Sequence, residues 1–95
     1  MSRDPQILAE VKRTLALLAS KAPGKAIEVR IPPYAAIQCG DGPIHTRGTP
    51  PNLIEMGAET WLSLMKGEIS WDQALASGQV RASGARADLR SYLPL

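Results

Sequence analysis

Residues 60–95 read TWLSLMKGEISWDQALASGQVRASGARADLRSYLPL, and this stretch contains the clearest element boundaries in the sequence. Gly67 can adopt the left-handed backbone conformation that closes a helix. Ser70 and Gln73 have the spacing of a capping box, in which each side chain accepts a hydrogen bond from the other residue's backbone N–H. Gly78 is placed to close the helix that this box begins. The stretch therefore predicts two consecutive short helices, one ending at Gly67 and one running from Ser70 to Gly78.

The flanks of these two helices continue the pattern. The first helix is expected to start at Ala58, because the apolar period changes there from two residues to about 3.6. Residues 79–83 alternate in the manner of a short strand. A last helix is expected over residues 85–93, where Pro94 stops it. That helix would direct three side chains inward: Leu89, Tyr92 and Leu93.

The chain before residue 58 predicts one long helix and several strands. A helix is expected over residues 5–21, because Asp4 can cap it, Pro5 suits its first position and the pattern is amphipathic. Short strands are expected at four places: residues 26–31, 34–39, 44–47 and 52–56. Pro32-Pro33 bends the chain between the first two strands or marks a sheet edge. Because the connections are too short for crossovers, we expect antiparallel pairing.

Length and composition indicate one globular domain over residues 1–95. The net charge of +2, from 11 basic and 9 acidic residues, is too small to indicate nucleic-acid binding. No apolar stretch approaches the ~18 residues that cross a bilayer, so we expect no stable membrane insertion. The single cysteine and the lack of a signal-peptide pattern indicate a cytoplasmic location.

Few residues are typical of an active site. His45 is the only histidine, and no pair of residues has metal-ligand spacing, so we expect no metal and no other cofactor. Cys39 and His45, with Arg47, can form a catalytic group, but a buried inert cysteine and a structural histidine are commoner, and we expect no enzymatic activity. Residues 45–52 read HTRGTPPN. In this loop Arg47, His45 and Thr49 either bind an anion or satisfy backbone groups of the loop itself.

A resemblance to a known family covers nearly the whole chain. The stretch WLSLMKGEISWDQALASGQVRASG resembles the C-terminal half of the sterol carrier protein type-two-like domain. The matching positions are Leu62, Leu64, Gly67, Ala74, Gly78, Val80, Gly84 and Leu89. EVRIPPYAAIQC, GPIHTRGTPPNLIEM and the terminal YLPL are similar to a small actinobacterial branch of that group, often called sterol carrier family protein.

The resemblance implies an α/β (α+β) fold in which helices cover one face of a curved, mostly antiparallel sheet of about five strands. In the family, an apolar tunnel between the helices and the sheet binds lipids, and the final helix helps to close it. This chain is shorter than that pattern, which leaves less room for a tunnel.

We therefore expect non-catalytic binding or transfer of a lipid or another apolar small molecule in a cavity between helices and sheet. Burying acyl chain contributes about 0.8 kcal/mol per methylene. The candidate wall residues are Trp61, Leu64, Met65, Trp71, Leu75, Val80, Leu89, Tyr92 and Leu93, with Ile27, Val29 and Ile37 of the sheet opposite. The alternative is that these side chains fill one another's space. The domain is then a closed-core interaction module, for example a homodimer, without a ligand.

Overall fold

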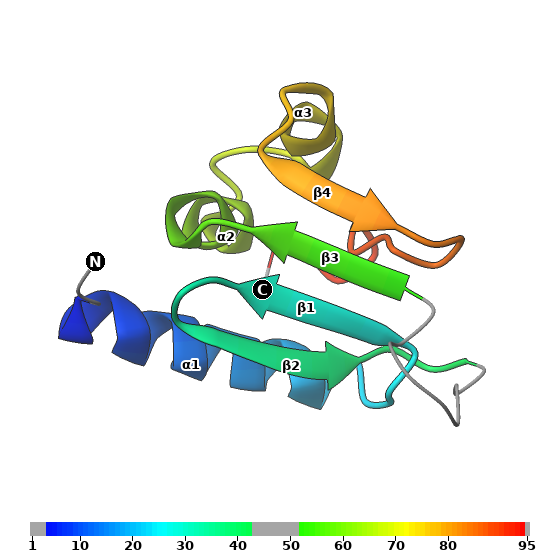
Figure 1. Cartoon of the computed structure of the whole chain (residues 1–95), viewed down its shortest axis with the longest axis horizontal. Coiled ribbons are helices and arrows are strands. Elements are labelled where there is room, and N and C mark those ends of the chain that lie inside the picture. Colours follow the sequence, from blue (N-terminus) through cyan, green and yellow to red (C-terminus); the bar gives the residue numbers. More distant parts are fainter. Residues whose placement is uncertain (1–3, 43–51, 95) are drawn as a thin grey trace.

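The computed structural model describes residues 4–42 and 52–94, which form three helices and a four-stranded sheet (Figure 1). The helices are α1 (Pro5–Lys21), α2 (Ala58–Lys66) and α3 (Trp71–Ala76). The strands are β1 (Ile27–Ile31), β2 (Ala35–Cys39), β3 (Asn52–Met56) and β4 (Val80–Ser83). Each of these elements was predicted within two residues at either end. The strand predicted over residues 44–47 lies outside the described residues.

The sheet has the strand order β2-β1-β3-β4, so β1 and β3 lie at its centre. β2 pairs with β1, and β4 with β3, in antiparallel fashion, which confirms a mostly antiparallel sheet. The inference that all neighbouring strands are antiparallel is wrong, because β1 and β3 run parallel, with Val29 opposite Ile54. That inference assumed that strands adjacent in sequence are adjacent in the sheet. Instead β2 returns the chain to the end where β1 begins, and β3 starts from that end on the other side of β1.

The helices pack on one face of this sheet, and no helix among the described residues covers the other face (Figure 1). Along β1 the side chains alternate accordingly: Ile27, Val29 and Ile31 are buried, whereas Glu28 and Arg30 lie on the opposite face and pair with each other. α1 lies beside β2 and buries one stripe of its surface, as its amphipathic pattern predicts (Figure 1). The core is therefore a single layer between the sheet and the helices.

The helix start and stop signals of the sequence are confirmed. The Asp4 carboxylate accepts from the backbone N–H of Gln6 at 2.8 Å and caps α1. Gly67 follows α2 in the left-handed conformation, with φ of 78°. The capping box of α3 is complete: the Ser70 hydroxyl accepts from the Gln73 N–H at 3.1 Å, and the Gln73 amide oxygen accepts from the Ser70 N–H at 3.0 Å. These bonds satisfy two backbone N–H groups at the start of α3 that have no partner within the helix.

Residues 84–94, here called the C-terminal tail, form turns, so the helix predicted over residues 85–93 is wrong. The Asp88 carboxylate accepts from the backbone N–H of Arg90 at 2.8 Å. This local bond competes with helical hydrogen bonding. The segment is also too short to be stable as a helix without help from packing. A propensity-based prediction fails here because a side chain supplies a local partner for the backbone.

The tail nevertheless packs against the core. Leu89 is 0% exposed, and Tyr92 and Leu93 are partly buried against the same cluster. The backbone N–H of Tyr92 donates to the carbonyl of Leu89 at 2.9 Å, which closes a tight turn between them. The inward direction predicted for these three side chains therefore holds without the helix.

Asn52 fastens the tail to the centre of the sheet. Its side chain is almost fully buried at the start of β3. The amide Nδ2 donates to the carbonyl of Ala26, and Oδ1 accepts from the backbone N–H of Arg86, both at 2.9 Å. One side chain thus joins three segments that are far apart in sequence.

Candidate functional site

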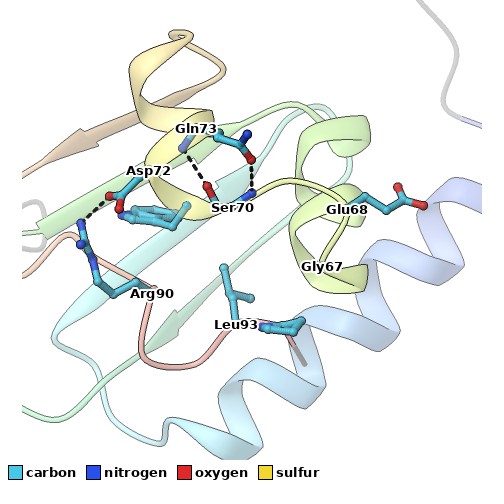
Figure 2. A pocket seen from close by; sticks show the side chains of 9 residues that line it. Gly67, Glu68, Ser70, Asp72, Gln73, Arg90 and Leu93 are labelled. Atoms are coloured by element: carbon cyan, nitrogen blue, oxygen red, sulfur yellow. Dashed lines mark hydrogen bonds and ion pairs between the residues drawn. The ribbon is translucent and has the colours of Figure 1, made fainter.

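A surface pocket of about 440 Å³ lies where the α2–α3 connection, the start of α3 and the C-terminal tail meet (Figure 2). Its lining residues are Gly67, Glu68, Ser70, Trp71, Asp72, Gln73, Arg90, Leu93 and Pro94. This volume falls within the ~300–1,000 Å³ typical of small-molecule sites. The pocket is our candidate functional site.

Two of the pocket walls are formed by residues that belong to local sequence patterns. Gly67 takes a backbone conformation that other residues rarely adopt, and it turns the chain from α2 toward α3. A Cβ built on Gly67 would lie 3.6 Å from Pro94, so the tail also packs closely on this turn. Ser70 and Gln73 are occupied by the capping box and define the rim at the start of α3.

A charged group crosses the pocket from the tail to α3. The Arg90 guanidinium lies 2.9 Å from an Asp72 carboxylate oxygen and 2.9 Å from one of Asp88. Figure 2 shows Arg90 reaching from the tail toward Asp72, while Glu68 points away from both. Because the Arg90 and Asp72 side chains are more than half exposed, this pair contributes at most about 1 kcal/mol. The charged bridge can therefore open at little cost.

Trp71 is the large apolar side chain of the site. It lines the pocket, yet only 5% of its surface is exposed. Within the part of the chain that the structure describes, its indole Nε1 is buried without a hydrogen-bond partner. Buried polar groups in folded proteins are nearly always paired, so this donor is exceptional.

The other tryptophan lies in a different environment. Trp61 of α2 is fully buried, and its Nε1 donates to the Thr14 hydroxyl of α1 at 2.7 Å. That hydroxyl in turn donates to the carbonyl of Glu10 at 2.7 Å. Trp61 is thus a satisfied core residue that connects two helices.

The pocket contains two of the nine predicted wall residues, Trp71 and Leu93. Four others are buried in the core: Trp61, Leu64, Val80 and Leu89. The remaining three are partly buried: Met65, Leu75 and Tyr92. Of the opposing sheet residues, Ile27 and Val29 are buried and Ile37 is partly buried. His45, Arg47 and Thr49 lie outside the described residues.

Sequence reasoning missed the polar part of the site. The sequence patterns place Gln73 only in the capping box and assign no role to Asp72 or Arg90. Thr14 and Asn52, which form buried hydrogen bonds in the core, were also missed. A usable signal existed for Thr14, because it occupies an apolar position of the α1 pattern between Val11 and Leu18.

Cys39 is a poor candidate for a nucleophile. It is 0% exposed at the end of β2, where it lies opposite Ile27 of β1. Burial raises the pKa of its thiol from 9.0 to about 11. Since the thiolate is the reactive form of cysteine, the thiol is unreactive near neutral pH. Within residues 4–42 and 52–94, no three His, Cys, Asp or Glu side chains are grouped as metal ligands.

The buried thiol makes stability sensitive to alkaline pH. The unfolded chain releases the Cys39 proton near pH 9.0, but the folded chain keeps it until about pH 11, so rising pH favours the unfolded state. We expect this group to lower the free energy of unfolding by about 2 kcal/mol between about pH 8 and about pH 11. Urea denaturation of the wild type and of Cys39→Ala measures the difference, which the variant should lack. The same pH dependence in both proteins would contradict the assignment.

Two comparisons with known proteins were informative in different ways, one with curated proteins and one with protein families. None of the described helices has the length and apolar character that a bilayer crossing requires. A comparison with curated proteins finds no match. The model of one family, described as bacterial SCP ortholog, where SCP abbreviates sterol carrier protein, matches residues 3–95. Because the match spans almost the whole sequence, the chain belongs to this family of bacterial SCP orthologs.

Proposed function

We propose that this protein binds a lipid or another apolar small molecule, without catalysing a reaction, in the pocket between α3 and the C-terminal tail. The observation that carries the proposal is the pocket of about 440 Å³ that opens beside Trp71, Leu93 and Pro94. Membership in a sterol-carrier-like family supports the same class of ligand. The cytoplasmic location and the actinobacterial branch inferred from the sequence are part of this proposal.

The tail gives such a ligand a way toward the interior. It is a series of turns, and its charged bridge to α3 through Arg90 and Asp72 is exposed and weak. Leu89 of the tail itself is buried in the core, so a shift of the tail opens a path there. Each methylene that leaves water contributes about 0.8 kcal/mol, so a short alkyl chain can offset the loss of the bridge.

The nine wall residues take different roles in this proposal. Trp71 and Leu93 make the first contacts, because they line the pocket. A ligand that extends inward as the tail shifts then meets the partly buried and buried members of the set: Met65, Leu75, Tyr92, Trp61, Leu64, Val80 and Leu89.

A titration with a fluorescent medium-chain fatty acid tests the proposal, alongside mass spectrometry of lipids that co-purify. We expect saturable binding to the wild type. Leu93→Asp should weaken it by about tenfold or more, since it removes a leucine contact and introduces a charge. Leu17→Asp is the matched control, because Leu17 is 41% exposed on α1, and it should bind like the wild type. No saturable binding and no co-purified lipid would remove the carrier function.

The alternative, a closed-core interaction module, is favoured by one observation. Trp61, Leu64 and Leu89 are at most 1% exposed and pack within one cluster, as they would in a core that excludes ligands. If the titration finds no binding, sedimentation velocity distinguishes a homodimer from a monomer that binds some other protein.

A further inference from the structure

The indole of Trp71 indicates what kind of ligand the pocket accepts. Only 5% of the Trp71 surface is exposed, and less than 1 Å² of its Nε1 atom is accessible to solvent. Within the described residues, Trp71 Nε1 is the one buried side-chain nitrogen or oxygen atom without a hydrogen-bond partner. Trp61 provides the comparison in the same core, because its Nε1 donates to Thr14 at 2.7 Å. The fold therefore supplies an acceptor for the indole N–H of Trp61 but none for that of Trp71, which lines the pocket.

The other polar side chains of the pocket are exposed, so water satisfies the donors and acceptors that they leave unpaired. Ser70 and Gln73 bond to each other in the capping box. Arg90 pairs with Asp72 and with Asp88, each at 2.9 Å. Within the described residues, the Trp71 Nε1 is therefore the donor of the pocket that neither water nor a protein group satisfies, and an incoming molecule can supply its acceptor.

The net charge of the pocket lining indicates which acceptor group a ligand can present to Trp71 Nε1. The lining contains two carboxylates, on Glu68 and Asp72, against one guanidinium, on Arg90, which gives a net charge of −1. The guanidinium is also shared with Asp88 outside the lining. A free carboxylate on the ligand would meet like charge and a cation that is already neutralised. An uncharged acceptor avoids both problems.

We propose that the ligand of this pocket is an uncharged amphipathic molecule whose carbonyl oxygen, as in a ketone or an ester, accepts a hydrogen bond from Trp71 Nε1. Its alkyl part lies against Leu93 and Pro94. Since Nε1 is closed to solvent, the oxygen reaches it as neighbouring side chains of the pocket shift. This inference rests on the proposed function and adds the headgroup chemistry to it.

The test follows the two indole N–H resonances of the ¹⁵N-labelled protein, one from each tryptophan, during titration with 2-nonanone, n-nonane or nonanoate. We expect 2-nonanone to move the Trp71 indole proton downfield with saturation, while the Trp61 resonance stays in place as an internal control. n-Nonane should bind, as seen from methyl shifts, without that downfield movement. Nonanoate should bind more weakly than 2-nonanone.

The variant Trp71→Phe keeps an aromatic ring and removes the donor. It should weaken 2-nonanone binding by about tenfold more than it weakens n-nonane binding, because only 2-nonanone loses a hydrogen bond. If neither nonanone nor nonane binds the wild type, the proposed function fails. If both bind but the Trp71 resonance does not move, or if nonanoate binds most tightly, the headgroup inference fails and the carrier function stands. The Trp71 resonance of the wild type tests the headgroup inference even if Trp71→Phe does not fold.

Discussion

Replacing Trp61 by alanine is expected to lower the free energy of unfolding by about 3–5 kcal/mol. Trp61 is fully buried on α2, and its Nε1 donates to Thr14 of α1. Alanine removes the ring that fills the space between these helices, and it removes their hydrogen bond. A typical domain is stable by only about 5–15 kcal/mol, so this single change takes a large part of the total.

Urea denaturation followed by far-ultraviolet circular dichroism measures the effect. Leu17→Ala is the matched control on α1, because Leu17 is 41% exposed, and its effect should stay within about 0.5 kcal/mol. Trp61→Phe keeps most of the ring and should fall between the two. A loss below about 1 kcal/mol for Trp61→Ala would mean that the two helices do not depend on this contact.

Asn52→Ala is expected to lower the free energy of unfolding by about 2–4 kcal/mol, because two backbone groups lose their partner. The Asn52 amide donates to the carbonyl of Ala26 and accepts from the N–H of Arg86, and only 4% of the residue is exposed. Alanine cannot replace either bond. The local loss of stability should be largest where β1, β3 and the tail meet.

Hydrogen exchange locates this effect. The Arg86 amide should exchange faster in Asn52→Ala than the global loss of stability alone predicts, because it loses its acceptor. Gln38→Ala, at an exposed position of β2, should leave both stability and the Arg86 exchange rate near the wild-type values. Unchanged protection of Arg86 in Asn52→Ala would show that another group satisfies its N–H.

The sequence predicts the parts of the fold that depend on neighbouring residues. The cap at Asp4, the left-handed Gly67 and the Ser70–Gln73 box are local hydrogen-bond patterns, and each is present in the structure. The amphipathic stripe of α1 likewise follows from spacing alone. The family resemblance supplied the helix-on-sheet layering, which local patterns do not determine.

The parallel strand pair and the pocket depend on contacts between distant residues, whereas the missing tail helix also involves a local bond. The spatial order of the strands sets the parallel pairing of β1 with β3, and strand propensity carries no information on that order. The tail lost its predicted helix because Asp88 offers the Arg90 N–H a local bond and because the core accepts Leu89 from a turn. The pocket depends on how the tail seats across α3, so neither Arg90 nor Asp72 could be assigned to it beforehand.

The parallel pairing at the centre of the sheet also affects how the chain folds while it is being synthesised. Once residues 27–39 leave the ribosome, β1 has β2 on one side and nothing on the other until residues 52–56 follow. Leu89, which is buried in the core, is synthesised later still. During this interval the bare edge of β1 is a template for strands of other nascent chains. The synthesis of β3 therefore ends the period in which this edge of β1 can pair with other chains.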